Sequence, residues 1–332
     1  MTTGTPELSL EPEGGAFSGV GTPGAGAGEI AARSPWQLFW RRLKGDKVAL
    51  TALVVVVLLV LIALLAPLII KLFGAPAYDH FDHKALDSFG QPTGPGGNHI
   101  LGVDNHGGDV FSRTLYGARV SLTVAIAATG ISMLIGIAVG LFAGFYRGWV
   151  DTLLSRSMDV LLAFPILLLA LGIGSACSDP KKGCLGGALK PGEGLVIAVI
   201  AFANWPYVAR LVRGQVLSLR EKEFVEAARS LGASGPRIVF REILPNLVAP
   251  IIVYASLVIP QNVLFEAALS FLGVGVQFPG ASWGDMLANA APIFYSAWWF
   301  MLFPGLALLI TVLAFNLVGD GLQDALNPRG GR

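Results

Sequence analysis

Long apolar runs alternate with short polar connections along most of the chain. Six stretches are apolar enough, and at about 20 residues long enough, to cross a membrane as helices, which satisfy their own backbone hydrogen bonds in hydrocarbon. They lie near residues 48–70, 121–145, 153–174, 195–212, 247–272 and 300–319. This pattern predicts an all-α polytopic membrane protein with six transmembrane helices.

The fourth stretch is the weakest of the six. The stretch 195–212 holds Asn204 and Pro206 and ends in arginines, but removing it would break the orientation described below. Pro165 and Pro206 predict local kinks in the third and fourth spans, which neighbouring helices can absorb.

Composition and charge agree with a membrane protein. Of 332 residues, 54% are hydrophobic and 14% are charged, which is more apolar than a soluble globular chain. The formal net charge of +1 is uninformative about partners, and we expect no nucleic-acid ligand. Lys and Arg favour cytoplasmic flanks, and most of them fall on one side when the N-terminus is placed inside. We therefore expect a multi-pass protein of the cell membrane with both termini cytoplasmic.

The regions outside the spans divide by composition. Residues 1–34 lack the basic and apolar pattern of a signal peptide and are Gly/Pro/Ser-rich, which predicts a disordered cytoplasmic tail. Residues 35–47 are amphipathic and suit a juxtamembrane segment at the lipid surface. We expect 71–120 to be extracytoplasmic, 121–319 to form the core, and 320–332 to be a second cytoplasmic tail.

The only two cysteines lie in one predicted external loop. Cys177 and Cys184 bracket the sequence CSDPKKGC, and an oxidising exterior permits a disulfide between them. The alternative is a pair of free thiols. A CxxC-type metal or redox motif is disfavoured, because six residues separate the cysteines.

Small and polar residues mark particular faces of two spans. Gly136, Gly140 and Gly144 recur every four residues, which predicts a close helix–helix contact. In the fifth span, Asn262, Glu266 and Ser270 recur in the same way and share one face. Polar and ionisable groups at membrane depth are costly, so we expect this second face to line a translocation pathway. The alternative is a structural hydrogen-bond clasp.

The sequence holds no catalytic constellation. No lysine follows a glycine, so there is no P-loop, and no G-x-S-x-G or H-E-x-x-H pattern occurs. We therefore expect a transport subunit and not an enzyme, with no cofactor or metal of its own. Any nucleotide hydrolysis must come from a partner.

A polar stretch between the fourth and fifth spans carries the most specific signal. The sequence EFVEAARSLGASGPRIVFREILPN, residues 223–246, is patterned as a helix, a turn and a second helix. It resembles the EAA signature of permease subunits of ABC importers. The resemblance implies a cytoplasmic coupling loop over 221–246 that docks on an ATPase subunit. Its key positions are Glu226, Ala227, Ala228, Gly232, Leu244 and Pro245.

Three further segments, 99–122, 265–287 and 302–329, resemble the C-type permease of dipeptide and oligopeptide ABC importers. The resemblance covers residues 36–329. It implies the type I importer fold with six spans, a second homologous permease, two ATPase subunits that bind ATP and Mg²⁺, and an external substrate-binding protein. An outer-gate motif would comprise His99, Gly102, Asp104, Asp109 and Arg113. Val103, Gly108 and Glu242 depart from the family pattern.

The cargo remains open at this point. A peptide passed from the binding protein to the cytoplasm by alternating access is the first reading, and nickel or another small solute is the second. All four histidines, His80, His83, His99 and His106, lie near aspartates in the external segment, but a solvated loop explains them better than a metal site. An ion-coupled secondary carrier is disfavoured, because no internal repeat is visible.

Overall fold

The computed structural model describes residues 35–97, 99–177, 179, 183–184, 190–276 and 278–326, and both predicted tails lie wholly or partly outside this range. The elements, in chain order, are α1 (Pro35–Gly45), α2 (Lys47–Leu72), η1 (His83–Ala85), α3 (Val110–Phe145), α4 (Trp149–Leu162), α5 (Ile166–Ala176), α6 (Glu193–Leu219), α7 (Glu223–Ser230), α8 (Gly235–Arg237), η3 (Ile238–Ile243), α9 (Leu244–Phe271), α10 (Trp283–Ala290), η4 (Ala291–Ile293) and α11 (Trp298–Leu326). Only isolated β-bridges accompany the helices in the described residues. The all-α membrane fold is confirmed.

Five helices are long and apolar enough to cross a membrane. They are α2, α3, α6, α11 and the continuous run Gly235–Phe271, which joins α8, η3 and α9. A sixth crossing would consist of α4 and α5 together, whose axes are bent by 84°. The kink expected at Pro165 is therefore a break of the third span into two helices. In contrast, α6 continues through Pro206.

Two helices extend beyond the predicted spans. Helix α3 begins at Val110, where the Asp109 side chain accepts a hydrogen bond from the Ser112 amide at 2.9 Å. This N-cap adds three helical turns before the predicted span. The second helix of the polar stretch runs directly into the fifth span.

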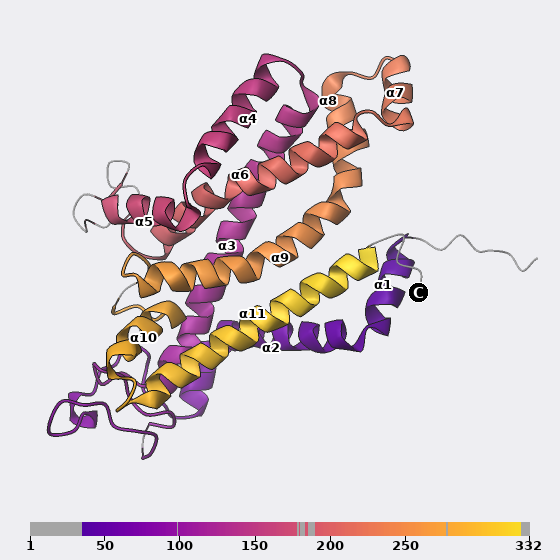
Figure 1. Cartoon of the computed structure of the whole chain (residues 1–332). Helices are drawn as coiled ribbons and strands as arrows, with labels where there is room; N and C mark the ends of the chain where they lie inside the picture. The colour runs from indigo at the N-terminus through magenta and orange to yellow at the C-terminus, as the bar shows by residue number, and fades with distance from the viewer. Residues whose placement is uncertain are drawn as a thin grey trace, which may run out of the picture.

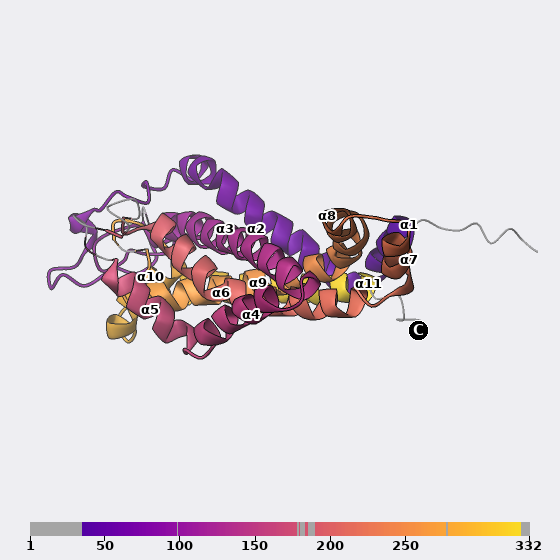
Figure 2. The ribbon, with the colours of Figure 1, turned by 90° about the horizontal axis from the view of Figure 1, so that it is seen from above.

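The long helices lie side by side in an elongated bundle (Figure 1). At one end lie α1, α7, α8 and the C-terminal end of α11, and at the other lie α10 and the segment that joins α2 to α3, as both views agree (Figure 2). We call these the coupling end and the opposite end. Helix α3 contacts α6 most extensively, and α9 and α2 also pack on it.

The glycine stripe of α3 forms the contact with α6, as predicted. A Cβ atom at Gly140 would lie 2.7 Å from the Ala209 carbonyl oxygen, and one at Gly144 would lie 2.6 Å from Cβ of Val216. Real Cβ atoms do not approach so closely. Only glycine therefore permits this separation of the two backbones.

The N-terminal helix α1 packs against the end of α11. Phe39 and Leu43 are buried with Ala49 and Ala325 in one apolar cluster. Asp46 then accepts hydrogen bonds from the amides of Val48 and Ala49 and so begins α2 directly after α1. The juxtamembrane segment is thus fixed to the bundle.

The α3–α6 contact predicts a difference between two glycines of one helix. Gly140→Ala is expected to destabilise the protein by about 1–3 kcal/mol, because the methyl group must push the two helices apart. At Gly130 a Cβ would meet no atom within 4 Å. Gly130→Ala should therefore leave stability unchanged or raise it by up to ~1 kcal/mol. Thermal unfolding of both variants in detergent measures this, and equal midpoints would contradict the close contact.

Candidate coupling segment, cavity and polar network

The polar stretch at residues 221–246, here the coupling segment, folds back on the bundle through its apolar residues. Val225, Ile238, Val239 and Ile243 are buried in a cluster that also contains Val212 and Val216 of α6. At the turn, Gly232 has φ +81°, and the Ala233 amide donates to the Ala228 carbonyl at 3.0 Å. This left-handed position, which glycine adopts without strain, ends α7.

The coupling-motif residues predicted from the sequence gather on or near this turn. Glu226 and Ala227 are exposed, Ala228 is half-buried, and Gly232 is exposed. Leu244 and Pro245 lie apart from them, at the start of α9. The first group is therefore mostly accessible at the surface, and the second begins the span.

Sequence reasoning missed the apolar part of this surface. Leu231 is 89% exposed, Phe240 is 57% exposed and Phe224 is 38% exposed, all within the coupling segment. Exposed apolar side chains on an otherwise polar loop mark an interaction surface. The signal was in the sequence, because Leu231 directly precedes the turn glycine at the end of a charged helix.

An ion pair joins the start of the coupling segment to the turn between α3 and α4, and a neighbouring arginine joins the end of α6 to α3. Arg147 donates to Glu221 at 2.6 Å, and Arg220 donates to the Gly144 carbonyl, also at 2.6 Å. The hydrogen bond from Arg147 lowers the pKa of the exposed Glu221 carboxyl. The carboxylate thus stays charged over the whole physiological range.

The polar residues of α9 form a closed cluster inside the bundle. Glu266 is fully buried and accepts hydrogen bonds from Ser121 of α3 and Ser270, both at 2.7 Å. Asn262 donates to Thr129 of α3 at 2.8 Å. Each of these polar groups has a partner. Glu266 and Asn262 join α9 to α3, whereas Ser270 supports Glu266 from the same helix.

A cavity of about 220 Å³ lies between α6 and α9, next to the start of α5. Its lining residues are Ile166, Asn204, Tyr207, Val208, Tyr254, Val258, Gln261, Asn262 and Phe265. The cavity therefore borders Asn262 but neither Glu266 nor Ser270. The face of α9 that carries Tyr254, Val258, Gln261 and Phe265 lines it, next to the face singled out from the sequence.

At the opposite end, Arg113 of α3 joins three parts of the chain. Its guanidinium lies 3.0 Å from Asp104 and donates to the carbonyl oxygens of Tyr78 at 3.3 Å and Gly280 at 3.0 Å. Asp285 of α10 lies 3.9 Å away, and burial raises the pKa of its carboxyl although Arg113 opposes the shift. Arg113 and Asp104 are both buried. The pair therefore depends on its hydrogen bonds and not on solvent.

The other motif residues support the same network. His99 lies 3.0 Å from Asp109, the N-cap of α3. Gly102 has φ +78°, and a Cβ there would lie 2.6 Å from Nε1 of Trp299. That indole donates to the Val103 carbonyl at 3.2 Å. The five predicted outer-gate residues therefore come together, in a packed structure that ties the α2–α3 segment to α10 and α11.

Gly108, one of the departures from the family pattern, lies within this network. A Cβ atom at this position would lie 2.7 Å from Asp104 Oδ2 and 2.9 Å from Cδ of Arg113. The Gly108 amide also donates to Asp104 at 2.7 Å. The missing side chain thus leaves room for the Asp104–Arg113 pair.

The histidine-rich segment has structural contacts. His106 stacks on Phe278, with ring centroids 4.6 Å apart, while His99 holds Asp109. Within the described residues, no group of three or more His, Cys, Asp or Glu side chains has a metal-binding arrangement.

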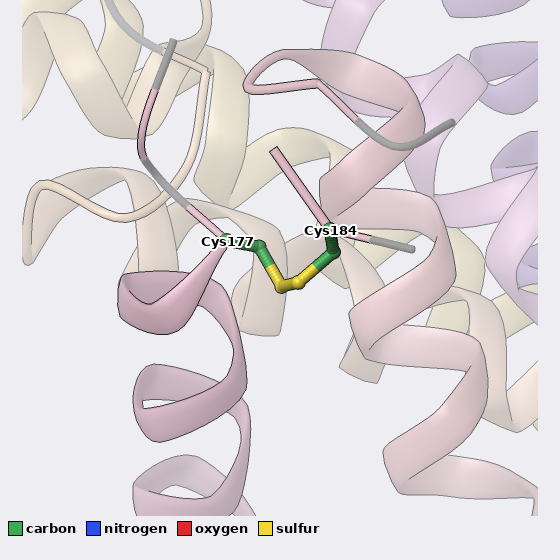
Figure 3. The surroundings of a disulfide bond; sticks show 2 residues. All are labelled: Cys177 and Cys184. Carbon is green, nitrogen blue, oxygen red and sulfur yellow. A yellow bond between two sulfur atoms is a disulfide. The ribbon is translucent and has the colours of Figure 1, made fainter. Parts of the chain in front are cut away.

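A disulfide joins Cys177, at the end of α5, to Cys184 in the following loop (Figure 3). Several residues of this loop lie outside the described range. Cys177 is buried among residues of α3, α6 and α9, and Cys184 packs against the same cluster. The bridge therefore fixes the start of the loop to the helix bundle.

Comparison with known proteins places the chain in a family. Residues 136–331 match the family described as binding-protein-dependent transport system inner membrane component. The chain belongs to this family. Residues 34–84 also match the N-terminal transmembrane domain of oligopeptide transport permease C. Members are permease subunits, so this chain is a membrane transport component of an ABC importer.

Curated relatives match over most of their length. The chain is 40% identical to the dipeptide transport system permease protein DppC of Alkalihalophilus pseudofirmus, over 91% of this chain and 92% of the relative. It is 41% identical to the glutathione transport system permease protein GsiD of Pectobacterium atrosepticum, over 90% and 93%. It is 46% identical to a putative peptide transport system permease protein of Brucella suis, over 71% and 75%.

The fold is that of known ABC importer permeases. A chain of the MetNI methionine ABC transporter, in an inward-facing conformation, superposes with a TM-score of 0.54 at 18% identity. The match covers 65% of this chain and 96% of that chain. At this identity the likeness concerns the fold alone.

The network of polar contacts around Arg113 predicts a large loss of stability when the Arg113 side chain is removed. Arg113→Ala leaves the buried Asp104 carboxylate without its partner, at an expected cost of about 3–5 kcal/mol. Arg119→Ala on the same helix is the matched control, because Arg119 is exposed, and should cost less than about 0.5 kcal/mol. Thermal unfolding of the two variants would show the difference. A melting temperature for Arg113→Ala equal to that of the control would refute a stabilising network.

Proposed function

We propose that this family member is one of two permease subunits of an ATP-driven importer of di- and oligopeptides. The relatives named above are dipeptide, glutathione and peptide permeases at 40–46% identity, which supports this cargo class. The α6–α9 cavity would form one half of the pathway, and a second, homologous permease would form the other. An external binding protein would deliver the cargo at the opposite end.

The observation that carries the proposal is the connection between the coupling segment and the cavity. The coupling segment follows α6 and runs without a break into α9, and these two helices line the cavity. A displacement of Leu231 would reach α9 through the short turn 231–234 and the continuous run Gly235–Phe271, and it would reach α6 through α7 and residues 220–222. No other segment in the described part of the chain joins the two walls so directly.

ATP and Mg²⁺ would bind to two ATPase subunits, and this chain would supply no catalytic group. Closure of the ATPases would move α7 with Glu226, Ala227 and Gly232, and the two cavity helices would follow. Pro206 of α6 and Pro260 of α9 lie beside cavity residues. Proline weakens the helical hydrogen-bond ladder, so both helices can bend beside the cargo. Both termini would lie in the cytoplasm.

The docking surface predicts that coupling fails when its apolar tip becomes charged. Leu231→Asp, alone and combined with Glu226→Arg, should lower ATP-dependent peptide uptake roughly tenfold or more, because a buried apolar contact at an interface centre is worth about 2 kcal/mol. The amount of ATPase subunit that co-purifies with the tagged chain should fall in parallel. Both are measured on the complete transporter from gently solubilised membranes.

Gln323→Glu is the control for this experiment. Gln323 is exposed near the end of α11, at the coupling end but outside the coupling segment. It should retain both uptake and ATPase. A native chain that purifies without any ATPase would refute the importer proposal. Full activity of the Leu231→Asp variant would show that this surface has no docking role.

A further inference from the structure

The wall of the α6–α9 cavity is polar but uncharged. It carries three side-chain amides, from Asn204, Gln261 and Asn262, and two phenols, from Tyr207 and Tyr254. The remaining lining residues are apolar, and the wall contains no Asp, Glu, His, Lys or Arg. Exposed polar groups at the centre of membrane-spanning helices are costly against lipid. The wall therefore suits water and a cargo that forms hydrogen bonds.

The three amides have different tasks. Asn204 donates to Asn262 at 2.6 Å, and Asn262 donates to Thr129 at 2.8 Å. These two amides thus hold α6, α9 and α3 together. Gln261 is exposed in the cavity, and its side chain makes no hydrogen bond within the described part of the chain. The N–H donors and the carbonyl acceptor of this side chain therefore remain available.

We propose that Gln261 is a cargo-contact residue in a wall that recognises peptide main-chain groups and does not distinguish cargo by charge. The inference rests on the proposed function and names the specificity of the same cavity. A primary amide donates and accepts, so it pairs with both the C=O and the N–H of a peptide. Tyr207, Tyr254 and Phe265 add apolar contact that fits many side chains.

The absence of charge from this wall matters because a fixed charge in a partly shielded site attracts one cargo sign and repels the other. The wall also lacks the carboxylate, imidazole and thiolate groups that bind divalent cations. A divalent ion such as nickel would find only neutral amide and phenol oxygens on it. The inference therefore favours peptide over nickel as the transported solute.

The test is to place a charge at this position with almost no change in shape. The complete transporter, with Gln261→Glu in this chain, is reconstituted in vesicles and supplied with two tripeptides of equal length, one cationic and one anionic. The uptake ratio of cationic to anionic peptide should rise roughly tenfold over the native ratio, because the new carboxylate attracts one and repels the other. Comparison with the native ratio cancels any preference of the binding protein.

Gln215→Glu is the matched control. Gln215 is exposed on α6 but does not line the cavity. This variant should leave the uptake ratio at its native value. An unchanged ratio in Gln261→Glu, or the same shift in both variants, overturns the inference. If the native transporter keeps its ATPase but takes up neither peptide, then the proposed function itself is wrong.

A second variant covers the case in which Gln261→Glu does not assemble. Both native cysteines are joined in the disulfide, so Gln261→Cys would carry the one free thiol of the chain. A membrane-impermeant, positively charged thiol reagent should react with it and lower the cationic-to-anionic uptake ratio. Failure of the thiol to react would show that Gln261 does not face a water-filled pathway, and would overturn the inference.

Discussion

The rest of the structure depends on the close approach of α3 and α6. Three glycines of α3 face valines and backbone of α6 at distances that leave no room for a Cβ atom. This contact places Asn204 and Tyr207 at the cavity wall. Farther along α6, Val212 and Val216 belong to the same buried cluster as Val225 and Ile243 of the coupling segment. The separation of α3 and α6 therefore positions both the cavity and the coupling segment, whose movement is proposed to change the shape of the cavity.

Buried polar contacts hold the remaining helices to α3. Near the opposite end, Arg113 joins α3 to the α2–α3 segment and to the loop before α10, and Glu266 joins α3 to α9 through Ser121. Such contacts are strong in a low-dielectric interior only when every partner is in place. Helix α3 is therefore the helix to which these other parts of the bundle are attached. The coupling segment packs mainly through apolar side chains, and one ion pair joins its Glu221 to Arg147.

The sequence alone predicted the features that follow from period and composition. The apolar runs predicted the membrane-spanning helices, and the four-residue spacing of Gly136, Gly140 and Gly144 predicted a close helix–helix contact, which α3 makes with α6. It did not predict which face of α9 borders the cavity, because that helix is apolar nearly all round and its polar residues occupy neighbouring faces. Ionisable Glu266 drew attention to a face that packing buries, whereas Gln261 lies open. The 84° break at Pro165 also depends on tertiary contacts, since proline in a span is compatible with a mild bend.

The break before α5 has a consequence for water. Helix α5 begins at Ile166 without a side-chain cap, so its first amide N–H groups lack helical acceptors. Each would cost several kcal/mol in hydrocarbon. Because Ile166 borders the cavity, water in the cavity would satisfy them. A permanently wet half-channel would dissipate ion gradients unless one end stays shut. We propose that the opposite end provides this closure, because Arg113 there joins α3 to the α2–α3 segment and to the loop before α10.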